Sequence, residues 1–180
     1  MKKLIKISVA FVLVAFVILL VNNKITIGIL KQGAQQVKSK NVLSELRNEK
    51  SNSIIKDNRI FSENSIYVIN LWGARCKPCI KEMPALNFLF EKYNKKSVKF
   101  IALSKFNDDS IRFSKIGVDY KFKKFYHEGK LFDFFQNLNP SKRKIIPITI
   151  VINKQGNIEY FFEGSSKQNI QLIDLYLSKE

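Results

Sequence analysis

The chain has two cysteines, Cys76 and Cys79, which are separated by two residues and lie between two segments of different character. Residues 66–72, IYVINLW, form an apolar run that is typical of a buried strand, and residues 78–93 have the pattern of a helix. The cysteines therefore lie at a strand-to-helix junction. There the unpaired N–H groups and the positive end of the helix stabilise a thiolate.

This spacing favours a redox-active dithiol over other uses of cysteine. Two cysteines cannot build a disulfide scaffold or supply the four sulfur ligands of a cysteine-rich zinc site. The alternative is a buried permanent disulfide or an inert thiol pair, but a disulfide across a two-residue loop restricts the unfolded chain only slightly. We therefore expect Cys76 and Cys79 to form a redox-active disulfide.

The rest of the C-terminal two thirds alternates between strand and helix patterns. A second strand is expected at 98–103, and the order strand, helix, strand predicts parallel strands in an α/β layer. The further elements expected are a short helix at 108–117, a strand at 122–126, a helix at 131–138, strands at 145–152 and 158–162 with a turn at 153–156, and a closing helix at 167–178.

The N-terminal segment predicts a membrane anchor. Residues 7–23 carry no charged side chain, and the apolar stretch at 4–21, which includes Lys6, gives about 18 positions, the short end of a spanning helix. A cleaved signal peptide is the alternative, but no small-residue cleavage site directly follows the apolar run. We expect an anchor at 1–24, a polar spacer at 25–60 and a domain at 61–180. That domain is expected outside the cytoplasm, at the cell (inner) membrane, because long domains translocate largely regardless of flanking charge.

The charge balance is strongly positive, with 31 Lys and Arg against 15 Asp and Glu, a net charge of +16. Such a field favours acidic partners, anionic lipids or nucleic acid. The sequence has no ribonucleoprotein aromatic box and no zinc finger, so we expect a solvated lysine-rich surface and no nucleic-acid partner.

Residues 72–84, WGARCKPCIKEMP, resemble the active-site segment of the membrane-anchored thioredoxin-like thiol:disulfide oxidoreductases of the TlpA/ResA type. The run Cys-x-Pro-Cys-x-x-Glu-x-Pro is far more specific than a bare Cys-x-x-Cys, and the segment 146–149 resembles the cis-proline loop of the family. The resemblance covers residues 60–180. It implies a thioredoxin fold, a central mixed sheet flanked by helices, behind a single N-terminal transmembrane helix.

The resemblance also implies how the site works. Cys76 is expected to attack a partner disulfide and Cys79 to resolve the mixed disulfide. Pro147 is expected to lie in cis against the dithiol, where Ile146 would pair with an extended substrate segment. Trp72 is expected to be a packing residue that flanks the site and completes the substrate-binding surface.

Two charged residues near the cysteines, Glu82 and Arg75, are expected to influence the thiols. Glu82 lies one helical turn after Cys79, so it is a candidate for proton exchange with that thiol; the alternative is an acid that complements the helix dipole. Arg75 stands where the family commonly has a second Trp before the first cysteine. Its charge, with those of Lys77 and Lys81, predicts a stabilised Cys76 thiolate.

The resemblance implies protein disulfides as substrates, with apocytochrome c among the candidates, and a membrane thiol reductant upstream. Neither a cofactor nor a metal is expected. The alternatives are a membrane-anchored copper-delivery protein of the same fold and a thiol peroxidase. The copper proteins have three residues between the cysteines and a distant His, whereas here the spacing is two and the only histidine is His127. No separate peroxidatic cysteine is present.

Overall fold

The computed structural model describes residues 17–18, 41–48, 61–62, 64–94, 97–106 and 108–180. The chain divides into two units, Met1–Gly33 and Ala34–Glu180, and every described element after Val17 and Ile18 belongs to the second. Within these ranges no helix is both long and apolar enough to span a membrane. The predicted anchor at 1–24 lies, apart from Val17 and Ile18, outside the described residues.

Five strands form one mixed sheet in the second unit. They are β1 (Ile66–Leu71), β2 (Val98–Leu103), β3 (Lys123–Phe125), β4 (Ile148–Ile152) and β5 (Ile158–Glu163). Their order across the sheet is β3-β2-β1-β4-β5. The first three strands run parallel to one another, and β4 is antiparallel to both of its neighbours. The expected central mixed sheet is therefore confirmed.

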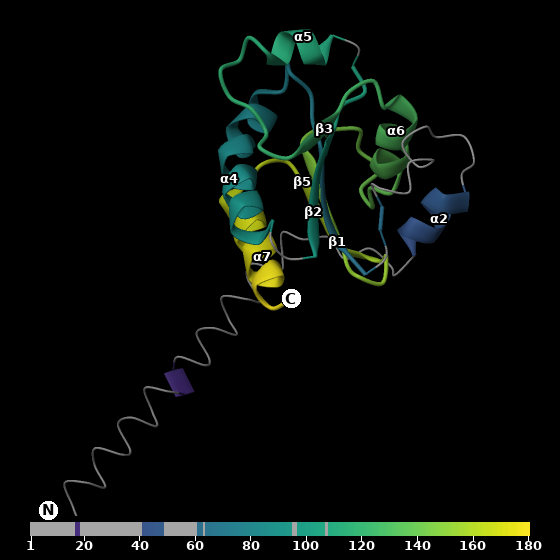
Figure 1. Ribbon diagram of the computed structural model, residues 1–180, viewed down its shortest axis with the longest axis vertical. Coiled ribbons are helices and arrows are strands. Elements are labelled where there is room, and N and C mark those ends of the chain that lie inside the picture. The colour runs from purple at the N-terminus through teal and green to yellow at the C-terminus, as the bar shows by residue number, and fades with distance from the viewer. Residues whose placement is uncertain (1–16, 19–40, 49–60, 63, 95–96, 107) are drawn as a thin grey trace, which may run out of the picture. The chain divides into compact units, whose positions relative to one another are not determined.

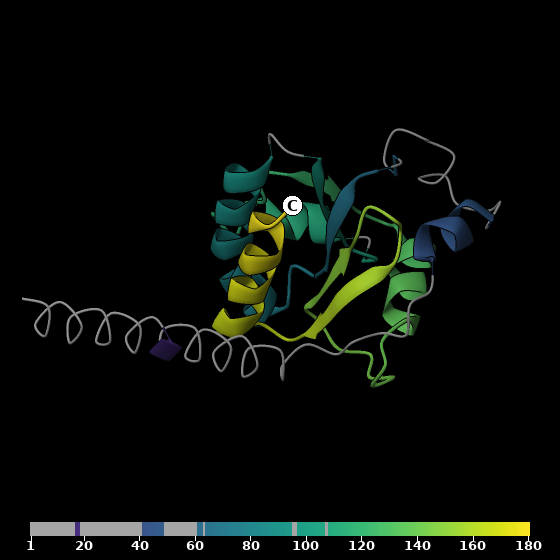
Figure 2. The same cartoon turned by 90° about the horizontal axis from the view of Figure 1, so that it is seen from below.

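Helices cover both faces of this sheet (Figures 1 and 2). On one face lie α4 (Lys77–Tyr93) and α7 (Lys167–Ser178), and on the other lie α6 (Gly129–Asn137) and α2 (Val42–Asn48). The short α5 (Asp109–Phe113) follows β2 in the chain and lies at one end of the domain. Because both faces are covered, every side chain of β1 is buried, which explains a continuous apolar run in place of an alternating one.

Residues 41–48 correct the predicted extent of the polar spacer. Val42 and Leu46 are buried in the same core as the sheet residues, and the Val42 N–H donates to the carbonyl of Gly156 at 2.9 Å. The apolar residues at positions 42, 43 and 46 fall on one face of a single helical turn, so even this short helix can bury them. This part of the segment belongs to the domain, whereas the other boundaries stay predictions.

Substitution of Leu46 tests whether α2 supports the fold. We expect Leu46→Ala to lower the free energy of unfolding of the full chain by about 2–5 kcal/mol, because it removes a buried side chain and leaves a cavity. Ile111→Ala is the matched control, since that side chain is 66% exposed and its loss should change stability by less than about 0.5 kcal/mol. Equal denaturation midpoints for Leu46→Ala and the parent would show that α2 is dispensable.

Candidate active site

Two segments that are far apart in the sequence meet at one edge of the sheet. Leu71 ends β1 and pairs with Ile148, which begins the antiparallel β4. The residues after β1 therefore lie beside the residues before β4. As a result the carbonyl oxygen of Ile146 lies 3.6 Å from Sγ of Cys76, and the peptide bond between Ile146 and Pro147 is cis.

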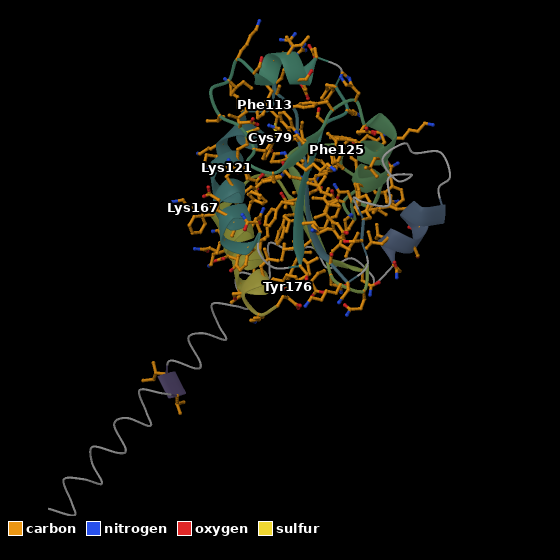
Figure 3. All side chains as sticks on the ribbon, viewed as in Figure 1. Cys79, Phe113, Lys121, Phe125, Lys167 and Tyr176 are labelled. Atoms are coloured by element: carbon orange, nitrogen blue, oxygen red, sulfur yellow. A yellow bond between two sulfur atoms is a disulfide. The ribbon has the colours of Figure 1, made fainter. Side chains whose placement is uncertain are left out.

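The first turn of α4 holds the two cysteines in different environments. They form a disulfide with an S–S distance of 2.05 Å, and Sγ of Cys76 accepts a hydrogen bond from the Cys79 N–H at 3.2 Å. Cys76 is the N-cap and is only partly buried, whereas Cys79 faces the core and is fully buried. Figure 3 shows Cys79 at the end of α4 that lies near Phe113 of α5. A partner disulfide can therefore reach only the Cys76 sulfur.

A groove with a volume of about 580 Å³ opens beside Cys76. Its walls come from the loop after β1, the start of α4, the loop after β2 and the residue before the cis proline. The lining residues are Gly73, Arg75, Cys76, Lys77, Pro78, Phe106, Asp108, Asp109 and Ile146. The reactive sulfur and the predicted substrate-pairing residue Ile146 thus share one surface.

Glu82 is buried one turn beyond Cys79, with 3% of its surface exposed. One carboxylate oxygen is 3.5 Å from Nδ2 of Asn70, and the other has no hydrogen-bond partner among the described residues. Burial raises the pKa of Glu82 to about 7, and the hydrogen bond from Asn70 partly opposes this. A carboxyl group with a pKa near neutrality can both accept and donate a proton. The dipole alternative has little basis, because Glu82 lies beyond the first turn of α4 and is shielded from solvent.

Asn70 is a site residue that the sequence analysis missed. It is buried in β1, it accepts a hydrogen bond from the Tyr120 hydroxyl at 2.7 Å, and it donates to Oγ1 of Thr149 at 2.9 Å. Burial raises the pKa of Tyr120 well above its ordinary value, so its hydroxyl stays protonated and donates. This fixes the amide with its NH₂ group toward Glu82. The signal in the sequence was one polar residue inside an apolar strand run.

Removal of the Asn70 amide tests its influence on Glu82. We expect Asn70→Ala to raise the pKa of Glu82 above 7, because the hydrogen bond that favours the carboxylate is lost while burial remains. Carboxyl carbon shifts in an NMR pH titration measure this pKa directly. Asn87→Ala removes a half-buried asparagine of α4 that bonds to the Asp119 carbonyl, and it is expected to leave the pKa of Glu82 unchanged. A Glu82 pKa that stays the same or falls in Asn70→Ala would contradict this role.

Trp72 does not contact the groove. Its side chain is fully buried and packs against Phe113, Tyr120 and Tyr126, with ring centroids 4.6, 5.4 and 5.9 Å apart. The predicted substrate contact through Trp72 is therefore wrong, because a side chain enclosed by three aromatic rings cannot touch a substrate at the surface. Trp72 instead supports the site from beneath.

Arg75 forms an ion pair with a carboxylate, and His127 lies in a loop. The Arg75 guanidinium is directed to Asp108, with 2.9 Å between the nitrogen and the carboxylate oxygen, and Asp108 also accepts from Arg112. Asp108 thus partly neutralises the charge of Arg75, and the stabilised Cys76 thiolate stays a prediction. His127 lies in the loop before α6 with a φ of 63°. In the described part of the chain, no group of three or more His, Cys, Asp and Glu side chains is placed to hold a metal ion.

Comparison with known proteins places the chain in a family. The model of the AhpC/TSA family matches residues 37–161, a range that contains the cysteine pair, the cis proline and α2. The chain belongs to the AhpC/TSA family. The match begins before α2, in agreement with the burial of that helix in the core.

Curated relatives of this family member are thiol-disulfide oxidoreductases named ResA. The ResA of Bacillus thuringiensis subsp. konkukian is 31% identical over 112 residues, which cover 62% of this chain and 61% of the relative. The ResA of Geobacillus kaustophilus is 29% identical over 109 residues, 57% of this chain and 58% of the relative. The chain thus matches about three fifths of the length of these relatives. The resemblance to the ResA type is confirmed.

Solved structures share its fold. A thiol:disulfide interchange protein of the thioredoxin family from Chlorobium tepidum superposes with a TM-score of 0.52 at 18% identity, covering 64% of this chain and 81% of that one. The MTB protein DsbF superposes with a TM-score of 0.51 at 15% identity, covering 65% and 81%. The predicted thioredoxin-like fold is therefore confirmed.

Proposed function

We propose that the protein is a thiol:disulfide oxidoreductase that exchanges electrons between its Cys76–Cys79 pair and disulfides of other proteins. One observation carries this proposal: a disulfide at a helix N-terminus has one fully buried sulfur and one sulfur that opens into a groove. A structural disulfide needs no such opening. The ResA relatives support the same activity.

In the reductive direction the dithiol form begins the cycle. The Cys76 thiolate attacks one sulfur of the partner disulfide, so that a bond forms between Cys76 and the partner while the partner's own S–S bond breaks. The released partner thiolate takes up a proton. Cys79 then attacks the Cys76 sulfur, the Cys76–Cys79 disulfide forms, and the second partner thiol leaves. Two electrons pass from the protein to the partner, and a reductant must restore the dithiol.

Glu82 is proposed to accept the proton that Cys79 loses in the second step. Cys79 is buried, so water has little access to its thiol, and Glu82 lies one helical turn away in the same interior. A carboxylate whose pKa is near 7 can take this proton at neutral pH and later return it. Ile146 is proposed to pair through its backbone with an extended partner segment, while the Pro147 ring keeps other nucleophiles and metals off the sulfurs.

We also propose a setting for this activity from the sequence. Residues 7–23 would anchor the chain in the cell membrane with the domain on the extracytoplasmic side, and a membrane thiol reductant would regenerate the dithiol. Apocytochrome c is a candidate partner on the strength of the resemblance alone. What supports this setting is the uncharged N-terminal run and the family resemblance.

Turnover of a protein disulfide tests the proposed function. The full chain, supplied with dithiothreitol, should reduce a disulfide-containing protein faster than dithiothreitol alone. The double variant Cys76→Ser/Cys79→Ser has no thiol, so it should add nothing to the background rate, and its circular dichroism spectrum checks that it is folded. Equal rates for the parent and the double variant would overturn the proposal.

A further inference from the structure

The groove beside the disulfide contains an exposed aromatic side chain with no role in the chemistry. Phe106, in the segment between β2 and α5, is 43% exposed. Its ring reaches to within 3.2 Å of the point where a Cβ on Gly73 would stand, and Cδ1 of Ile146 reaches equally close. Phe106 and Ile146 thus close over Gly73 from two directions. Together they make a continuous apolar surface next to Cys76.

Hydrogen bonds to two buried residues hold the backbone of Phe106 in place. The Phe106 N–H donates to Oγ of Ser104 at 3.3 Å, and its carbonyl accepts from the Asp109 N–H at 3.4 Å. Ser104 and Asp109 are both buried, and the Ser104 hydroxyl donates to the Asp109 carboxylate. The backbone on both sides of the ring is therefore anchored in the interior, so the ring is preorganised for contact.

Position 75, which lines the same groove, carries a charged side chain in place of an aromatic ring. At position 75, where related oxidoreductases commonly have Trp, this chain has Arg75, and its guanidinium is turned to Asp108 and is 70% exposed. Phe106 lines the same groove as Arg75, Asp108 and Cys76. The apolar wall that position 75 does not provide is present at position 106.

We infer that Phe106 is a specificity-determining residue that binds the apolar side chain next to the cysteine of a partner protein's disulfide-bearing segment. The inference rests on the proposed function. The occupant follows from the groove itself: Cys76 lines it, so any disulfide attacked by Cys76 must bring its flanking residues over Phe106 and Ile146. An aromatic or large aliphatic side chain buries apolar surface there, whereas a small polar one does not.

Two classes of disulfide substrate and one matched pair of variants test this inference. The reduced full chain is mixed with a peptide disulfide that has Phe beside the cysteine, and separately with oxidised glutathione, which has no large apolar side chain. We expect Phe106→Ala to lower kcat/KM for the peptide about tenfold and to leave the rate with oxidised glutathione unchanged. Phe88→Ala is the control, because Phe88 is also an exposed phenylalanine, at 59%, but lies on α4 outside this groove.

The outcomes separate the inference from the function on which it rests. Phe106→Leu should keep most of the peptide rate, because an aliphatic side chain still covers the groove, and the glutathione rate reports an intact fold in every variant. Equal peptide rates for Phe106→Ala and the parent would overturn the inference alone. A loss for Phe106→Ala that is the same with both substrates would also overturn it. A parent chain that reduces neither substrate would overturn the proposed function, and this inference with it.

Discussion

Cys76→Ser is expected to reduce the rate of exchange with a protein disulfide by about 10³-fold or more, because it removes the one sulfur that a partner can reach. Cys79→Ser should behave differently. Its Cys76 can still attack, but nothing resolves the product, so a covalent adduct with the partner accumulates. The two substitutions are chemically identical, so the difference between them reports position alone. Stopped-flow kinetics and non-reducing electrophoresis measure the two effects.

The opposite result is easy to recognise. If Cys79→Ser formed no adduct and Cys76→Ser formed one, the buried Cys79 sulfur would be the nucleophile. Exposure of the Cys76 sulfur would then not decide which cysteine attacks. If both variants formed adducts equally, the domain would open during turnover. Either finding would remove the functional distinction between the N-cap sulfur and the core-facing sulfur.

Glu82→Gln is expected to slow turnover by about 10²-fold at neutral pH, because the amide cannot accept the proton that Cys79 releases. The pH dependence should change as well. In the parent the rate should rise with pH through the Glu82 pKa of about 7, and in Glu82→Gln this inflection should be absent. Glu91→Gln, on the same helix but exposed, is the matched control and should retain the parent profile. A Glu82→Gln profile that keeps the inflection would assign it to another group.

The same substitution should stabilise the protein at alkaline pH. Burial raises the pKa of Glu82 from its ordinary value of 4.5 to about 7, so between these values the folded chain holds a proton that the unfolded chain releases. The free energy of unfolding therefore falls as the pH rises through this window, by roughly 3 kcal/mol in total. Gln does not ionise, so Glu82→Gln should be more stable than the parent above pH 7 and similar to it below pH 4.5. Equal stabilities on the alkaline side would mean that the charged form carries no burial penalty.

Much of the fold follows from local pattern. The apolar runs at 66–72 and 98–103 predict β1 and β2 closely, because strands covered on both faces need apolar side chains at most positions. The strand expected at 145–152 begins only at Ile148, because the cis peptide bond at Pro147 precedes the residues that pair with β1. The burial of α2 was missed because its few apolar residues lie in a polar segment, and only the tertiary contact with the turn at Gly156 decides their place.

Some residues of the candidate site can likewise be predicted from local spacing, and others depend on tertiary packing. Cys76, Cys79 and Glu82 share one helix, so their spacing alone predicts their proximity. The contact of Asn70 with Tyr120 depends on how β1 packs against a segment 50 residues away, which no local pattern reports. Trp72 was misplaced because a strand end has two faces, and its sequence does not show which one the core takes. Phe106 was overlooked because a phenylalanine in a loop is ordinarily a core residue.

A single-turnover experiment on the full chain shows whether Cys76 and Cys79 exchange electrons with a partner disulfide. The reduced protein is mixed with a protein that has one disulfide, the reaction is quenched with acid at intervals, and both disulfides are counted by mass spectrometry. The account predicts one partner disulfide lost for each Cys76–Cys79 disulfide formed, with a transient adduct through Cys76 between the two states. Formation of the Cys76–Cys79 disulfide without any loss of the partner disulfide would contradict it.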